Sequence, residues 1–385
     1  MMKYIISTFI GVMWLLHATF GQYQERMFFN AKFEPESHVI HGAGQSDEFA
    51  FAGYTEVMSP SRHPMLYMEY TGANDTPEEV KEELDMYKRI LSHYPEGVGL
   101  QLGLSMNSGG TGYSQDVADG VYDEGLIALA KHLDSLNRIV FVRIGYEANG
   151  FWNGYQAGSY KEAFQHVTNI FRNQTDSIAT VWCVHPVDNM TEIMTYYPGD
   201  EYVDWWSIDL FQTKFITNNT TAQFMDSAEV HQKPVMIGEA TPTETGVGQG
   251  QESWDNWYKV FFETIHENPV IKAFCYINRD WAYLGGQSSW GNSKLQDDPI
   301  VACLYREEMD LGLYQHAEAG IENNVSTLVS SEDAYVNSAQ PETSFGGEDY
   351  LYASVTSATN DTIKTFVKFG MSDKPVGNIS LAQLW

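Results

Sequence analysis

The segment IVFVRIGYEANGFW, residues 139–152, decides how this sequence is interpreted. Its first four residues are apolar and mostly β-branched, which is typical of a strand buried on both faces in a parallel sheet. A carboxylate, an amide and an indole follow at Glu147, Asn149 and Trp152. In α/β barrels the chemistry lies at the C-terminal ends of the strands. Strand alternation puts Arg143 on the same side as Glu147, so both are expected to point into the mouth of a barrel.

Length and charge narrow the class of protein. The 385 residues suit one barrel of about 250 residues with a smaller module beside it. The formal net charge of −29 disfavours nucleic acid and anionic membrane surfaces as partners. Aromatic residues make up 14% of the chain, and aromatic rings in a cleft suit the C–H faces of sugars, although most aromatic rings are core.

Apolar segments that resemble strands alternate with helical patterns along most of the chain. The expected strands are residues 38–45, 64–70, 98–106, 139–142, 179–185, 203–211, 234–239 and 270–277. The expected helices are residues 48–58, 76–94, 121–136, 160–171, 221–230, 254–265 and 299–309. Eight strands alternating with helices predict a (β/α)₈ barrel over residues 38–311. A doubly wound open sheet is the alternative, but no strand is followed by a glycine-rich nucleotide-binding turn.

The two ends of the chain differ from the barrel pattern. Residues 1–21 combine Lys3, a short apolar run and small residues before Gly21, which predicts a secretory signal peptide. Residues 318–385 are rich in Asn, Ser and Thr and contain alternating runs at residues 350–355, 362–369 and 379–384, which predict a small β-rich accessory module over residues 312–385. Residues 22–37 are a candidate partner for that module. We therefore expect an extracellular or periplasmic protein with no membrane insertion.

The three cysteines predict neither a disulfide framework nor a metal site. Cys183, Cys275 and Cys303 are odd in number and lack short spacing. Free thiols are the expected state, with a Cys275–Cys303 bridge as the alternative. No metal ion and no cofactor is expected.

A second segment, KPVMIGEAT at residues 233–241, repeats the pattern of the first. A buried strand ends in Glu239, as the strand before Glu147 ends near that residue. The fourth and seventh strands of a barrel end on the same face, so the two carboxyl groups are expected to share a cleft. Two carboxyl groups across a cleft can cleave a glycosidic bond, although either glutamate alone would be better explained as structural.

Three motifs resemble glycoside hydrolase family 26, whose signature is R-x-F-H-E-M-N-G-x-W. RIGYEANGFW (residues 143–152) is similar to that signature. YPGDEYVDWWSIDLF (residues 197–211) and KPVMIGEA (residues 233–240) resemble the sixth and seventh strands of the family. The resemblance covers residues 38–311 and implies a clan A retaining β-glycanase. In such an enzyme Glu147 would be the acid/base and Glu239 the nucleophile.

Two positions depart from the family pattern. Tyr146 stands where the family has His, and Phe211 stands where it has the Tyr that holds the nucleophile. Tyr276 or Tyr283 could supply the missing hydroxyl from the region of the eighth strand. These departures affect the expected substrate more than the expected mechanism.

Other residues near strand ends are candidates for binding the substrate, although each could equally be a rim residue with structural hydrogen bonds. The complete set of expected substrate-binding residues is Arg143, Tyr146, Asn149, Trp152, His41, Gln45, Glu69, Asn107, His185, Asp209, Tyr276, Trp281 and Trp290.

The sequence thus predicts a secreted, monomeric, endo-acting retaining glycoside hydrolase whose partner is a plant or algal polysaccharide. The resemblance favours β-mannan, with β-1,3-xylan or an algal galactan such as carrageenan or agar as alternatives. A non-catalytic carbohydrate-binding barrel and a polysaccharide lyase are the other hypotheses.

Overall fold

The computed structural model describes residues 23–44, 48–283 and 288–317, and three strands of the C-terminal region. The chain divides into two compact units, Met1–Ala319 and Gly320–Trp385. Gln45, expected at the end of the first strand, lies outside the described residues.

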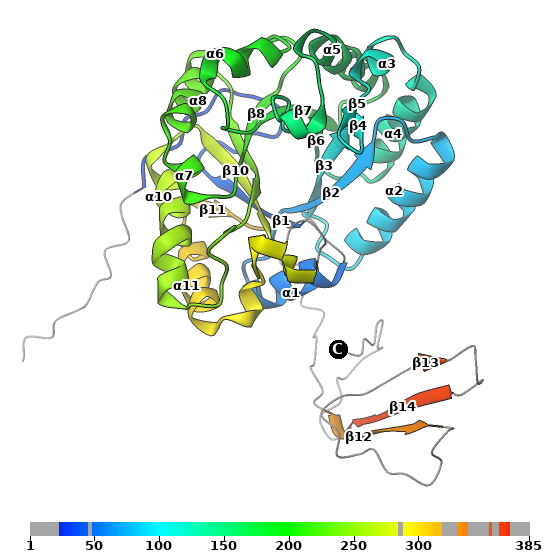
Figure 1. The fold of residues 1–385 in the computed structure, drawn as a ribbon, viewed down its shortest axis with the longest axis vertical. Helices are drawn as coiled ribbons and strands as arrows, with labels where there is room; N and C mark the ends of the chain where they lie inside the picture. The colour runs from blue at the N-terminus through cyan, green and yellow to red at the C-terminus, as the bar shows by residue number, and fades with distance from the viewer. Residues whose placement is uncertain are drawn as a thin grey trace, which may run out of the picture. The chain divides into compact units, whose positions relative to one another are not determined.

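The first unit is a closed barrel of eight parallel strands ringed by helices (Figure 1). Its strands are β1 (Val39–Gly44), β2 (Leu66–Gly72), β3 (Gly99–Ser105), β6 (Val140–Ile144), β7 (Ile178–Val184), β8 (Trp205–Leu210), β9 (Val235–Ala240) and β10 (Ile271–Ile277). β10 pairs in parallel with β1, which closes the sheet. The predicted (β/α)₈ barrel is confirmed, and the open-sheet alternative is wrong because of this closure. A short ninth strand, β11 (Tyr314–Gln315), also pairs with β1, so the unit continues past the expected residue 311.

The helices and short turns alternate with the strands. The α-helices are α1 (Glu48–Met58), α2 (Pro77–Leu91), α3 (Ser114–Ala118), α4 (Asp123–Ser135), α5 (Ala157–Gln174), α6 (Met190–Ile193), α7 (Thr213–Ile216), α8 (Asn219–Val230), α9 (Gln251–Ser253), α10 (Lys259–Glu267) and α11 (Pro299–Met309). α2 begins at a capping box, in which Thr76 and Glu79 satisfy each other's backbone N–H groups. The helix expected over residues 121–136 is preceded by a separate one, α3, because Gly120 at φ +80° interrupts the helical backbone.

A small hairpin occupies the loop after β3. Its strands are β4 (Asn107–Ser108) and β5 (Thr111–Gly112), which pair antiparallel. Gly109 and Gly110 connect them at φ +57° and +82°, values that suit a tight two-residue hairpin turn. The strands expected from the sequence do not include this hairpin.

The core has two parts, one inside the barrel and one between the barrel and its helices. Trp205 belongs to the inner part and Trp206 to the outer part, and both are fully buried. Adjacent strand residues face opposite sides, which explains how neighbouring indoles enter different layers. Cys183, Cys275 and Cys303 are all free, so the alternative Cys275–Cys303 bridge does not form.

The second unit contains an antiparallel sheet in the order β12, β14, β13. These strands are β12 (Ser330–Asn337), β13 (Ser354–Val355) and β14 (Thr362–Phe369). β13 and β14 fall within expected alternating runs, whereas the run at residues 379–384 lies outside the described residues.

The segment before β1 packs against the N-terminal ends of the barrel strands. Lys32 O accepts a hydrogen bond from the Trp205 indole at the start of β8. Lys272, fully buried near the start of β10, donates to Met27 O and Glu36 O. These contacts cover the end of the barrel opposite to the C-terminal ends of its strands.

We expect Arg26→Ala to lower the free energy of unfolding by about 2–4 kcal/mol, because it strips hydrogen bonds from buried carbonyl groups. The Arg26 side chain is 6% exposed and donates to Gln24 O, Ile265 O, His266 O and Asn268 O. Urea denaturation followed by circular dichroism measures the change.

Lys81→Ala is the matched control, because Lys81 pairs with Asp85 on the exposed face of α2. Such surface pairs contribute little, so this variant should unfold like the wild type. Similar midpoints for Arg26→Ala and Lys81→Ala would contradict a structural role for Arg26.

Candidate active site

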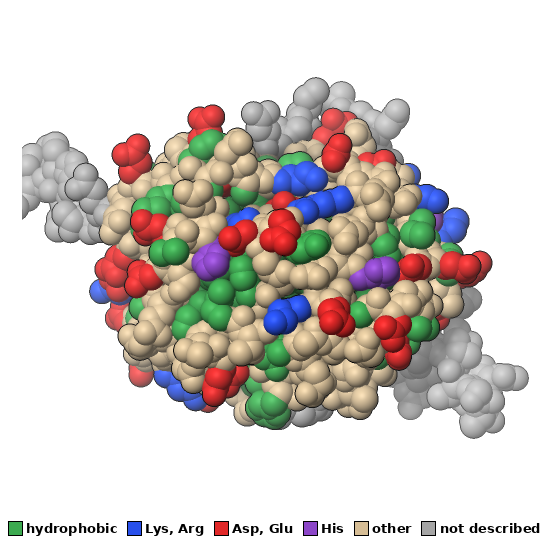
Figure 2. Space-filling view, turned by 90° about the horizontal axis from the view of Figure 1, so that it is seen from above, with side chains coloured by type: hydrophobic (Ala, Val, Ile, Leu, Met, Phe, Trp, Pro, Cys, Tyr) green, Lys and Arg blue, Asp and Glu red, His purple; other side chains and the backbone are tan. Residues whose placement is uncertain are grey.

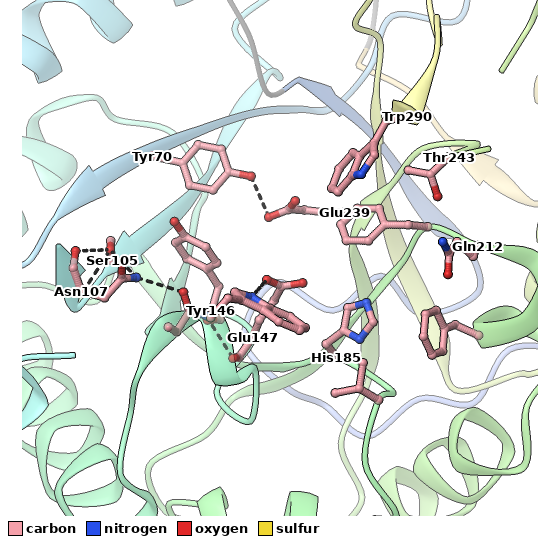
Figure 3. A pocket seen from close by; sticks show the side chains of 15 residues that line it. Tyr70, Ser105, Asn107, Tyr146, Glu147, His185, Gln212, Glu239, Thr243 and Trp290 are labelled. Carbon is pink, nitrogen blue, oxygen red and sulfur yellow. Dashed lines mark hydrogen bonds between the residues drawn. The ribbon is translucent and has the colours of Figure 1, made fainter. Parts of the chain in front are cut away.

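A pocket of about 610 Å³ opens at the C-terminal ends of the barrel strands. Its walls combine aromatic rings, amides and two carboxyl groups, and Figure 3 shows how they converge. The lining residues are Tyr70, Ser105, Asn107, Tyr146, Glu147, Trp152, Asn153, His185, Val187, Phe211, Gln212, Phe215, Glu239, Thr243 and Trp290. Glu147 follows β6 and Glu239 lies near the end of β9, so the fold brings the two glutamates into one pocket.

Glu239 is fixed by two hydrogen bonds to the same oxygen. Nη2 of Arg143 donates to Oε1 of Glu239 at 2.7 Å. The Tyr70 hydroxyl donates to the same oxygen at 2.6 Å, as Figure 3 shows. The Glu239 side chain is only 8% exposed. The preceding residue, Gly238, has no room for a side chain, because a Cβ there would lie 2.7 Å from Asp209 Oδ1.

Arg143 is fully buried and forms ion pairs with two acidic side chains. Its Nη1 donates to both carboxylate oxygens of Asp209, at 3.0 and 3.2 Å, while its Nη2 binds Glu239. Burial raises the pKa of Asp209, and the guanidinium on both of its oxygens opposes that rise. The single positive charge of Arg143 therefore interacts favourably with two buried carboxyl groups.

Glu147 occupies a different environment. Its Oε2 accepts a hydrogen bond from the Trp152 indole at 2.6 Å. Burial raises the pKa of Glu147 well above its usual value, and the negative charges of Asp209 and Glu239 raise it further. These effects favour the protonated form of the Glu147 carboxyl group.

The backbone at Glu147 is left-handed, with φ +49°. Non-glycine residues adopt this conformation at a cost of about 1–2 kcal/mol, so other contacts must hold it. Asn153 supplies them, since its amide donates to Tyr146 O at 3.0 Å and to Glu147 O at 3.2 Å. Asn107, on β4, donates in turn to Asn153 Oδ1 at 2.9 Å.

Five of the expected substrate-binding residues line the pocket. These are Asn107, Tyr146, Trp152, His185 and Trp290. His185 is 5% exposed and its ring lies among Trp152, Phe211 and Phe215. Burial lowers its pKa to about 4, so the imidazole is neutral at pH 7.

Arg143, Asn149 and Asp209 lie beneath or beside the pocket. The Asn149 amide donates to His185 O at 2.8 Å and accepts from His185 N–H at 2.9 Å. It thus ties the loop after β6 to the end of β7. Asp209 is fully buried against Arg143. These three side chains hold the site together and are not among the residues that line the pocket.

The remaining expected residues lie elsewhere. His41 is fully buried and bonds to Tyr54 and His316. Trp281 is 2% exposed behind the pocket residue Trp290, with ring centroids 4.9 Å apart. Tyr276 donates to Ser293 O, so it does not replace the family tyrosine on Glu239. The side chain of Tyr283 lies outside the described residues.

Glu69 is the expected site residue that strand register turns away from the pocket. Its carboxylate accepts from the hydroxyl of Tyr67 on the same strand. Met68 lies in the inner core and Tyr70, two residues on, also points inward. Tyr70 is therefore a functional residue that the sequence analysis missed, and the two-residue period from Met68 was the signal that could have found it.

No group of three or more His, Cys, Asp or Glu in the described parts of the chain is arranged to hold a metal ion. Within the same parts, the helices are all too short or too polar to cross a bilayer.

The family model for glycosyl hydrolase family 26 matches residues 116–248, which include both glutamates. The chain is a glycoside hydrolase family 26-like protein. A Vibrio sp. protein named beta-1,3-xylanase TXYA is 29% identical over 248 residues, covering 57% of this chain and 53% of that protein. An Alcaligenes sp. beta-1,3-xylanase is 27% identical, covering 56% and 51% respectively. The chain spans about half the length of these curated relatives.

Solved structures show the same fold at lower identity. The catalytic domain of an endo-beta-1,4-mannanase from Bacillus sp. JAMB-750 matches with a TM-score of 0.53 at 15% identity, covering 73% of this chain and 88% of that one. An endo-beta-1,4-mannanase double mutant from Cellulomonas fimi matches with a TM-score of 0.54 at 12% identity, covering 85% and 87%. The fold shared with these structures thus extends well beyond residues 116–248.

We expect Asp209→Asn to lower the pKa of Glu147, because it removes the negative charge that contributes most to raising that pKa after burial. The asparagine keeps an oxygen for Arg143. Titration of the Glu147 carboxyl carbon by ¹³C NMR measures the change.

Asp188→Asn is the control, since Asp188 binds the Asn149 amide and is not among the groups that shift Glu147. It should leave the pKa of Glu147 in place. If the pKa of Glu147 is unchanged or higher in Asp209→Asn, the charge of Asp209 is not what raises it.

Proposed function

We propose that the barrel hydrolyses internal bonds of a neutral β-linked polysaccharide with retention of configuration, using Glu147 as acid/base and Glu239 as nucleophile. The observation that carries the proposal is the pair itself. Burial and neighbouring negative charge raise the pKa of Glu147, while Glu239 is held by a guanidinium and a phenol. Such a division between donor and nucleophile is what a retaining glycosidase needs.

The geometry assigns a role to each oxygen of Glu239. Arg143 and Tyr70 both bind Oε1, so we assign the attack on the anomeric carbon to Oε2. As the new C–O bond forms, Glu147 passes its proton to the departing glycosidic oxygen. Glu147 then takes a proton from water, whose oxygen displaces Glu239 and restores both carboxyl groups.

The lining of the pocket supports a neutral substrate. Aromatic rings and amides dominate it, and no Lys or Arg stands among the lining residues in the described structure. Acidic side chains are also spread over the outer surface in Figure 2, in keeping with the net charge of −29. A sulfated galactan or the uronate substrate of a lyase would need cations here.

We propose β-1,3-xylan as the substrate, ahead of β-mannan. Both sequence relatives described above carry the name beta-1,3-xylanase. The mannanases resemble this chain in fold at 12–15% identity, which supports the barrel but says little about the sugar. A non-catalytic sugar-binding barrel is less favoured, because binding alone gives no reason to bury two carboxyl groups together.

We also propose that the chain is exported. The N-terminal pattern of Lys3, the apolar residues 4–16 and the small residues before Gly21 supports export. A polymeric substrate supports it as well, since the enzyme must meet that substrate outside the cell.

A panel of β-1,3-xylan, β-mannan, carrageenan and agar tests the function. Reducing ends should appear with β-1,3-xylan, and proton NMR in the first minutes should show the β-anomer of the product. Binding without reducing ends would favour the sugar-binding barrel, unsaturated ends would favour a lyase, and an initial α-anomer would rule out retention.

Glu147→Ala should lose about 10²- to 10⁴-fold in kcat/KM on the polysaccharide, because the leaving oxygen is no longer protonated. An aryl glycoside with a good leaving group should be cleaved far better, and azide should accelerate that reaction and yield a β-glycosyl azide. Equal losses on both substrates without azide rescue would remove Glu147 from the acid/base role.

Tyr70→Phe should lower kcat/KM by about 10- to 100-fold, the effect of losing one hydrogen bond to a charged group. Tyr113→Phe is the control, because the Tyr113 hydroxyl donates to Asn74 and Ser105 O at the rim. Initial rates on the polysaccharide measure both variants. Full activity in Tyr70→Phe would mean that Arg143 alone positions Glu239.

A further inference from the structure

Phe151 is an exposed aromatic side chain beside the acid/base. Its side chain is 86% exposed, although Trp152 after it lines the pocket and Asn153 is buried. Among the described side chains, the next most exposed large apolar residues lie away from the pocket, with Val230 at the end of α8, Val121 in the turn before α4 and Ile300 at the start of α11. Phe151 instead lies at the face of the barrel that contains the pocket.

The backbone under Phe151 is tightly held. The turn η1 (Phe151–Asn153) begins after Gly150, whose N–H donates to Glu147 O at 2.8 Å. It ends at Gly154 with φ +67°, where a Cβ would lie 2.5 Å from Gly110 O and 2.9 Å from Gly112 N of the β4–β5 hairpin. The turn is therefore pressed against the hairpin, and the exposed ring is presented from a fixed support.

The ring continues the aromatic wall next to Glu147. Phe151 and Trp152 meet nearly edge to face, with centroids 5.0 Å apart and planes at 73°. The Trp152 indole in turn donates to the Glu147 carboxyl group. A chain of two rings therefore leads outward from the Glu147 carboxyl group.

The side of the cleft follows from the proposed function, on which this inference rests. A general acid must reach the glycosidic oxygen that it protonates, so the departing sugar lies next to Glu147. That sugar, or the one after it, meets the wall formed by Trp152 and Phe151. Aromatic faces complement the C–H faces of neutral sugars.

We propose that Phe151 is a sugar platform on the leaving-group side of the cleft, which binds a neutral β-linked sugar beyond the cleavage point. This role explains why the Phe151 side chain is exposed to solvent although the backbone of its turn is tightly packed. It also predicts a contribution to the binding of long chains and acceptor sugars, and none to the chemistry of Glu147 and Glu239.

The experiment compares wild type, Phe151→Ala and Phe151→Trp on two substrates. Long β-1,3-xylo-oligosaccharides fill both sides of the cleft, whereas a β-xylobiosyl fluoride leaves the leaving-group side empty. Phe151→Ala should lose about 3- to 10-fold in kcat/KM on the oligosaccharides, the range expected for one aromatic contact, and match wild type on the fluoride. Phe151→Trp should keep activity on both.

A second measurement uses the fluoride as donor with added xylo-oligosaccharide as acceptor. Phe151→Ala should form less transfer product relative to hydrolysis, because the acceptor occupies the same side as the leaving sugar. Val230→Ala is the control, since Val230 is 81% exposed on an outer helix and should behave as wild type in both assays.

The outcomes separate this inference from the proposed function. A wild-type protein inactive on both substrates would refute the proposed hydrolysis of β-1,3-xylan and, with it, a platform for that sugar. An active wild type with Phe151→Ala unchanged on oligosaccharides would overturn the platform alone. Equal losses on both substrates would also overturn it, because the effect would then lie at Glu147 rather than in sugar binding.

Discussion

The site depends on one buried cation. Arg143 lies inside the barrel with no exposed surface, where an unpaired guanidinium would be very unfavourable. Asp209 from β8 and Glu239 from β9 neutralise it, and each receives a different nitrogen of the fork. This geometry sets the orientation of Glu239 and explains why only glycine fits at position 238, where a Cβ would meet Asp209.

The same arrangement of charges contributes to the raised pKa of Glu147. Two acids share one cation, so a third acid nearby is more stable with its proton. The strained backbone at Glu147 adds a geometric condition, which Asn153 and the β4–β5 hairpin meet through hydrogen bonds and close packing. Electrostatics and loop geometry thus separate the roles of two chemically identical side chains.

The two ends of the barrel have different tasks. Residues 24–36 cover the N-terminal ends of the strands, and the Arg26 hydrogen bonds fasten this segment to the end of α10 and to Asn268 in the loop before β10. The opposite end keeps a pocket of about 610 Å³. Stability is therefore concentrated away from the loops that carry Glu147, Phe151 and Trp290, as is usual in (β/α)₈ barrels.

The sequence by itself determined the barrel and the positions of both glutamates. Apolar runs of strand length recur eight times, and parallel strands end on one face, so Glu147 and Glu239 had to be neighbours. Only the tertiary structure decided which rim residues face the pocket. Register turned Tyr70 inward and Glu69 outward, while helix packing buried His41 and Tyr276 in hydrogen-bond networks away from the site. The reason is physical: local pattern specifies where a strand ends, but barrel closure and the packing of distant elements specify where each side chain points.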